Sequence, residues 1–134
     1  MDNILLYEED ADFRSRIVSE LSKYEGQFGL VIAATLEQAR KLISGQSIAL
    51  CVAGVDMGIA GHVDLISWSS TRHLKVPFIL MQNESAIHVS EVVNVFNILN
   101  VFTTPIEMSE ISNAVIEGLD TIDEGLLYRR LRSV

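Results

Sequence analysis

Short apolar runs alternate with amphipathic segments along the whole chain. Five runs have the length of strands, and they cover residues 3–7, 29–34, 48–54, 76–81 and 101–104. Four of the five are apolar throughout instead of alternating with polar residues. Strands of that kind are typical of a parallel sheet that is covered on both faces.

The segments between the runs have the period of helices. Phe13, Ile17 and Leu21 recur every four residues with charged side chains between them, which predicts an amphipathic helix. Further helices are predicted over 35–43, 63–73, 90–99 and 107–122, and Thr35 with Gln38 forms a capping pair for the second. Five strand–helix units predict an α/β fold: a five-stranded parallel sheet, doubly wound as (βα)5, with flavodoxin-like topology.

Composition narrows the possible classes of protein. The 134 residues are 49% hydrophobic and 21% charged, which favours one folded domain. A net charge of −8 makes direct binding of nucleic acid unfavourable. No apolar run reaches the length of a membrane span, and the N-terminus lacks the basic start of a signal peptide. We therefore expect no membrane partner. The single cysteine, Cys51, excludes an internal disulfide, and we expect a cytoplasmic protein.

Polar residues follow the predicted strands. Because ligand sites of such sheets lie at the carboxyl ends of the strands, these residues are the candidates for a site. They are Glu8, Glu9 and Asp10 after the first strand, Gly54 and Asp56 around the end of the third, Gln82 after the fourth, and Thr104 in the fifth. Carboxylates are ligands that Mg²⁺ prefers. The alternative is a solvated acidic rim in which Asp10 caps the first helix.

The order of these segments resembles the response-regulator receiver domain, as far as about residue 119. The segments that carry the resemblance are ILLYEEDADFRSRI, VIAATLEQARKLI, GIAGHVDLI, VPFILMQN and VFTTPIEMSEI. The resemblance implies receiver topology and two-component signal transduction or a phosphorelay. In that family a histidine kinase provides a phosphoryl group to an aspartate after the third strand. A metal ion, a lysine and a hydroxyl then stabilise the phosphoryl oxygens.

The chain departs from the family at the positions that perform this chemistry. The resemblance places the acceptor aspartate at Gly54, the hydroxyl at Gln82 and the lysine at Thr104. The aromatic switch residue falls at Val101, with Phe102 one step out of register and facing the other side. The departures together indicate a degenerate receiver, or pseudo-receiver, that is not an enzyme and works without phosphorylation.

Three features of the site remain open alternatives. Glu8 and Glu9 keep the family's acidic pair and, with Asp56, could bind Mg²⁺ weakly; no other cofactor is expected. Asp56 could itself accept phosphate with Mg²⁺, but this needs a shift of two residues against the family pattern. The space beside Gly54 could also admit a small ligand. The resemblance further implies a cis peptide bond between Thr104 and Pro105.

The predicted fourth helix is more apolar than its own domain requires. Its apolar arc spans about 200°, whereas docking on a sheet needs about 100°. In receivers the face of helix four, strand five and helix five binds partners and dimer mates. We therefore predict a protein partner or a homodimer at the residues Val92, Val93, Val95, Phe96, Ile98, Leu99, Val101 and Phe102.

The last helix carries an apolar seam beyond the usual end of a receiver. The seam comprises Ile111, Val115, Leu119, Ile122 and Leu126. We interpret 1–119 as a receiver-like domain, and 120–134 as an extended helix or the start of a connection to an output domain outside this chain. The predicted function is a non-catalytic signalling module of a two-component-type or transcriptional regulator.

Overall fold

The protein forms one parallel sheet with helices on both faces. The computed structural model describes residues 2–55, 65–66, 68–69, 76–82 and 98–132, with side chains of the last range described as far as 122. The sheet order is β2-β1-β3-β4-β5, and every neighbouring pair is parallel. The strands are β1 (Asn3–Tyr7), β2 (Gly29–Ala33), β3 (Ile48–Val55), β4 (Phe78–Gln82) and β5 (Ile98–Thr103). The predicted five-stranded, flavodoxin-like fold is confirmed.

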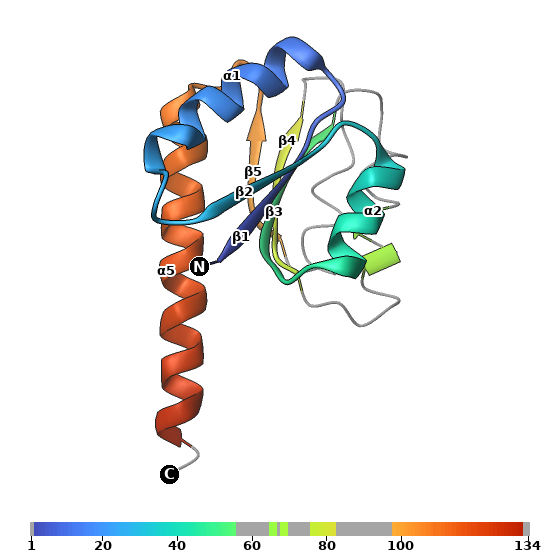
Figure 1. Cartoon of the computed structure of the whole chain (residues 1–134). Helices are drawn as coiled ribbons and strands as arrows, with labels where there is room; N and C mark the ends of the chain where they lie inside the picture. The colour runs from blue at the N-terminus through green and yellow to red at the C-terminus, as the bar shows by residue number, and fades with distance from the viewer. Residues whose placement is uncertain (1, 56–64, 67, 70–75, 83–97, 133–134) are drawn as a thin grey trace.

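Helices cover both faces of this sheet (Figure 1). The helices are α1 (Ala11–Leu21), the short 3₁₀ helix η1 (Ser22–Tyr24), α2 (Leu36–Gly45) and α5 (Met108–Arg132). α1 and α5 lie on one face, and α2 lies on the other with the helical residues 65–66 and 68–69. α5 continues past the amino ends of the strands toward the C-terminus. No helix in the described part of the chain has an apolar stretch long enough to cross a bilayer.

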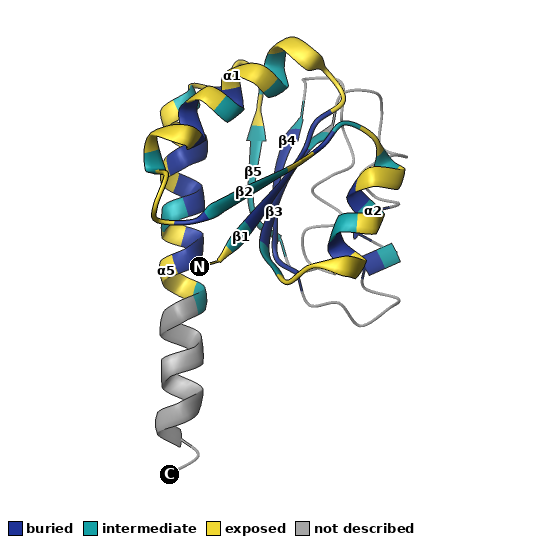
Figure 2. Ribbon diagram, viewed as in Figure 1, coloured by how far each residue is buried: buried dark blue, intermediate teal, exposed yellow. Residues whose placement is uncertain are grey.

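Alternation along the central strands divides the core into two clusters. The cluster under α1 and α5 includes Ile4, Leu6, Ile17, Leu21, Leu50, Val52, Ile111 and Val115. The cluster under α2 includes Leu5, Tyr7, Ala39, Ile43, Cys51, Ala53 and Leu65. Figure 2 shows β1 buried along nearly its whole length. Burial on both faces is the physical reason that its sequence is apolar throughout.

Two helix starts predicted from the sequence are confirmed. The Asp10 side chain accepts a hydrogen bond from the Phe13 N–H at 2.9 Å, so it caps α1. The Thr35 hydroxyl accepts one from the Gln38 N–H at 3.2 Å. The Gln38 side chain in turn accepts a hydrogen bond from the N–H of Ala34, the residue before the cap, at 2.8 Å.

The predicted start of the fifth strand is wrong. β5 begins at Ile98, so Ile98 and Leu99 belong to a strand and not to the preceding helix. Ile98 pairs with Phe78, and Leu99 packs toward α5, where its Cδ1 would lie 3.1 Å from a Cβ added at Gly118. A short apolar run fits a helix and a strand equally well, and only pairing with β4 decides between them.

The rest of the predicted fourth helix lies outside the described residues. This segment includes Val92, Val93, Val95 and Phe96 of the predicted interface. Asp56 and most of the predicted third helix also lie outside them.

Truncation of Ile17 tests the packing of α1 on the sheet. Ile17 is 0% exposed, and we expect Ile17→Ala to lower the free energy of unfolding by about 2–5 kcal/mol. Ile32 in the edge strand β2 is 44% exposed, so Ile32→Ala is the matched control and should cost less than about 1 kcal/mol. Urea unfolding followed by circular dichroism measures both, and equal losses would contradict the described position of α1.

Candidate functional site

The strand register brings the candidate residues to one edge of the sheet. Tyr7 pairs with Ala53, so Glu8 follows directly beside Gly54 on the neighbouring strand. Gly54 pairs with Met81, and Gln82 pairs with Thr103. The residues that the sequence analysis placed at this edge therefore do meet there, as far as they are described.

The two glutamates of the acidic pair have different environments. Glu8 is 3% exposed, whereas Glu9 is exposed at the rim. Side chains of a strand point alternately to its two faces, so Glu8 continues the row of Ile4 and Leu6. Glu8 thus faces the side of α1 and α5, while Glu9 continues the row of Leu5 and Tyr7.

The Glu8 carboxylate fills the space beside Gly54. A Cβ added at Gly54 would overlap Glu8 Oε2 and Cδ and would lie 3.1 Å from Oε1. The carboxylate therefore occupies the volume in which the side chain of any larger residue at position 54 would begin. The space that the sequence analysis considered open to a small ligand is filled by the protein itself.

Arg14 holds the backbone turn that leaves β1. Its Nη1 donates to the carbonyl oxygen of Glu8 at 2.8 Å and to that of Glu9 at 3.5 Å. A fixed positive charge thus lies close to the acidic residues, and the Asp10 cap fixes the following turn. Arg14 was not among the residues predicted to form the site. Its position four residues after Asp10, one turn into the helix, was the available signal.

Gln82 connects β4 to β5 at the same edge. The side-chain Nε2 of Gln82 donates a hydrogen bond to Thr103 Oγ1 at 2.9 Å. The backbone carbonyl oxygen of Gln82 accepts one from the Thr104 N–H at 2.8 Å. Gln82 Oε1 is buried and has no hydrogen-bond partner among the described residues. The Thr104–Pro105 peptide bond that follows is cis, the isomer that the resemblance implies. The resemblance places the family's hydroxyl at Gln82 and its lysine at Thr104, and neither residue carries the positive charge that stabilises a phosphoryl group.

Among the residues that the structure describes, the acidic pair offers a Mg²⁺ ion a single exposed carboxylate. Such an ion takes carboxylate oxygens in octahedral geometry, but only Glu9 of the acidic pair is exposed, and the buried Glu8 points toward Gly54. The part of the chain that the structure describes holds no group of three or more metal-ligating side chains. Asp56, the third predicted ligand, lies outside that part.

Val101 and Phe102 point to opposite faces of the sheet. Val101 packs against the cluster under α2, and Phe102 packs against the cluster under α1 and α5. This arrangement agrees with the predicted shift of the aromatic residue by one position. Both residues, like Ile98 and Leu99, are partly exposed in β5.

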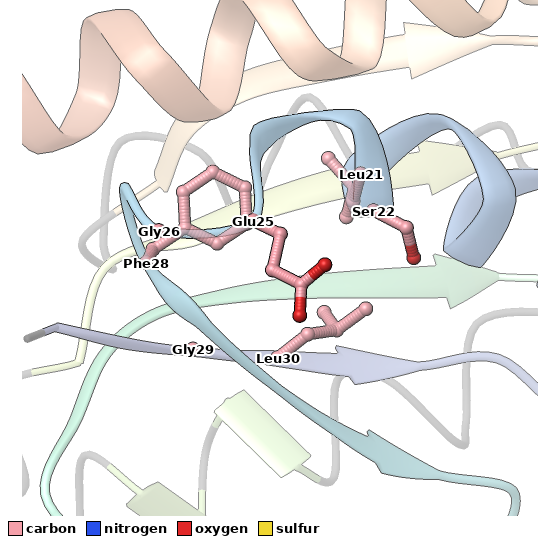
Figure 3. A pocket seen from close by; sticks show the side chains of 7 residues that line it. All are labelled: Leu21, Ser22, Glu25, Gly26, Phe28, Gly29 and Leu30. Atoms are coloured by element: carbon pink, nitrogen blue, oxygen red, sulfur yellow. The ribbon is translucent and has the colours of Figure 1, made fainter.

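A described pocket lies away from this edge (Figure 3). It has a volume of about 420 Å³ and is lined by Leu21, Ser22, Glu25, Gly26, Phe28, Gly29 and Leu30. Gly29 and Leu30 begin β2, so the pocket lies at the amino end of that strand. It is therefore separate from the residues at the carboxyl ends.

The pKa of Tyr7 depends on its burial and on the nearby carboxylate of Glu9. Burial of the ring, the charge of Glu9 and a hydrogen bond with Glu9 raise the pKa of Tyr7 from 10.0 to about 12. The folded protein therefore holds this proton more tightly than the unfolded chain does. The resulting stabilisation is fully present below pH 10.0 and is lost as the pH rises to about 12.

Titration of tyrosinate absorbance tests this environment. The chain has three tyrosines, and we expect one of them to ionise with a pKa of about 12. Tyr7→Phe should remove that step, and circular dichroism at each pH shows whether the fold persists. Ionisation of Tyr7 at its ordinary pKa in the folded protein would contradict the burial of its ring and its contact with Glu9.

Comparison with known proteins supports the fold alone. No family model matches the sequence, and no curated protein matches it. Among solved structures, the chain is similar to a CheY-like response regulator receiver domain protein from Methanospirillum hungatei JF-1. The TM-score is 0.80 at 15% identity, covering 93% of this chain and 98% of that one.

Two further structures show the same likeness. The signal receiver domain of an HD domain-containing protein from Pseudomonas fluorescens Pf-5 has a TM-score of 0.77 at 17% identity, covering 90% of this chain and 95% of that one. NtrX from Brucella abortus has a TM-score of 0.79 at 16% identity, covering 98% of this chain but 29% of that one. The chain thus has the fold of response-regulator receiver domains.

Proposed function

We propose that the chain is a pseudo-receiver: a non-catalytic signalling module that acts through contact with another protein and without phosphorylation. The observation that carries the proposal is the arrangement at Gly54. The resemblance places the phosphoacceptor there, yet the residue has no side chain, and the Glu8 carboxylate fills the space beside it. A nucleophile at that point would have to displace a buried group.

The neighbouring residues also argue against phosphoryl transfer. That reaction depends on cations that neutralise the oxygens of the transferred group. Thr104 stands at the lysine position, and the amide of Gln82 is engaged with Thr103. The Glu8 carboxylate is buried beside Gly54, whereas Glu9 is exposed. The acceptor and the lysine of the family therefore have no counterpart at Gly54 and Thr104.

The proposed setting is a cytoplasmic two-component-type or transcriptional regulator. Solved structures that resemble the chain include NtrX from Brucella abortus, in which the matching part is 29% of a longer chain. α5 of this chain continues as one helix to Arg132, past the amino ends of the strands. A helix of that length could connect the domain to an output domain, and this supports the second interpretation of residues 120–134.

β5 is the proposed site of contact with a partner or a second copy. It lies at the edge of the sheet, next to β4 alone, and its residues from Ile98 to Phe102 are partly exposed. Exposed apolar residues at a strand edge are a surface on which another chain can pack. We commit to a homodimer for the test, because it needs no unidentified partner.

Incubation with acetyl phosphate and Mg²⁺ tests the absence of phosphorylation. We expect the intact mass to stay unchanged, while a receiver with its acceptor aspartate gains a phosphoryl group in the same mixture. A gain that disappears in Asp56→Asn would overturn the proposal and establish the alternative acceptor. A gain that persists in Asp56→Asn would place the acceptor elsewhere and equally overturn it.

A charge introduced in β5 tests the contact surface. Val101→Asp should shift the protein from dimer toward monomer in sedimentation equilibrium, because an unpaired carboxylate is costly in an apolar interface. Ile32→Asp places the same charge on the opposite edge strand, β2, and should leave the dimer intact. A monomeric native protein, or equal loss of the dimer in both variants, would rule out this surface.

A further inference from the structure

Glu8 and Gly54 are neighbours on the two central strands. β1 and β3 are parallel, and the register that joins Leu6 to Val52 and Tyr7 to Ala53 continues to these two residues. Leu6 and Val52 both belong to the cluster under α1 and α5. Glu8 and Gly54 lie two positions beyond Leu6 and Val52, closer to the carboxyl edge of the sheet, and therefore face the same side as these two residues.

The fit between the two residues is steric. Glu8 Oε2 and Cδ lie where the first side-chain atom of a larger residue at position 54 would be, and Oε1 lies 3.1 Å from that point. Glycine is the residue type that leaves this volume empty. Without Glu8, the same volume would be a void near a tightly packed core, and such voids are unfavourable.

The burial of Glu8 changes what the acidic rim can bind. At 3% exposure, its carboxylate is shielded from ions in solution, while Glu9 remains exposed. Arg14 adds a positive charge at the carbonyl oxygens of the same two residues. A divalent cation at the rim would therefore meet one exposed carboxylate of the pair and a nearby guanidinium.

We propose that Glu8 is an internal substitute for the missing side chain of residue 54, and that by occupying this volume it prevents the acidic pair from binding a divalent cation. The inference rests on the proposed function and extends it, since it names the residue that closes the site. Residues 8 and 54 are then a coupled pair. A side chain at position 54 should expel the Glu8 carboxylate to the rim beside Glu9.

Gain of cation binding is the first test. Mn²⁺ is the probe, and its binding is measured by electron paramagnetic resonance with the full chain. Gly54→Ala should bind Mn²⁺ about tenfold more tightly than the native protein, because two carboxylates then share the rim. The double variant Glu8→Ala/Gly54→Ala should lose this gain.

Glu8→Asp provides a second route that leaves Gly54 unchanged. Its side chain is one methylene shorter, so the carboxylate no longer reaches the volume beside Gly54 and stays near the rim. We expect Glu8→Asp to gain Mn²⁺ affinity as well, even if Gly54→Ala folds poorly. Native protein that binds Mn²⁺ as tightly as both variants would overturn the proposal, because Glu8 would then not keep the cation out.

Coupling between the two residues is the second test. In urea unfolding, Gly54→Ala should lower the midpoint clearly in the native background, and much less when Glu8 is already alanine. Gly45→Ala is the control, since a Cβ at Gly45 meets nothing within 4 Å and should leave the midpoint nearly unchanged. Equal losses from Gly54→Ala in both backgrounds would overturn the steric pairing.

The result is separable from that of the phosphorylation test. If the intact mass stays unchanged and the Mn²⁺ and coupling results fail, the pseudo-receiver proposal stands and only the role of Glu8 is wrong. If the native protein gains a phosphoryl group, the proposed function fails, whatever the Mn²⁺ experiment shows.

Discussion

The parallel pairing of β1 with β3 is the interaction on which the core and the site both depend. The pairs Leu5–Cys51, Leu6–Val52 and Tyr7–Ala53 are almost completely buried. Because side chains alternate between the faces, a slip of one residue would turn each of them toward the wrong cluster. The two packed faces therefore fix this register. The register in turn sets the positions of the residues that follow Tyr7 and Ala53.

The arrangement of the site follows from the register of β1 and β3. Extended by one residue, the register places a glutamate beside a glycine and directs both toward the side of α1 and α5. The carboxylate of Glu8 then fills the volume that Gly54 leaves. Arg14, the Asp10 cap and Gln82 hold the surrounding backbone through hydrogen bonds of 2.8–2.9 Å. The edge of the sheet thus has an ordered backbone at the positions that the structure describes.

The boundary between the predicted fourth helix and β5 shows where local patterns stop being informative. Ile98 and Leu99 extend an apolar segment that satisfies a helical period as well as a strand. Ile98 pairs with Phe78 in the adjacent strand, and Leu99 packs where Gly118 lets α5 approach. Both contacts are distant in sequence, so the propensity of the segment itself could not reveal them.

The sequence by itself determined the five strands, their parallel arrangement and the caps at Asp10 and Thr35. These features depend on residue identity, on continuous apolar runs and on the helical period of 3.6, which a sequence displays directly. Only the tertiary structure decided that Glu8 is buried while Glu9 is exposed, and that Arg14 binds the turn between them. Those outcomes depend on which residue of the neighbouring strand lies beside Glu8 and on how much space that residue leaves. The residues adjacent to Glu8 in the sequence do not indicate either property.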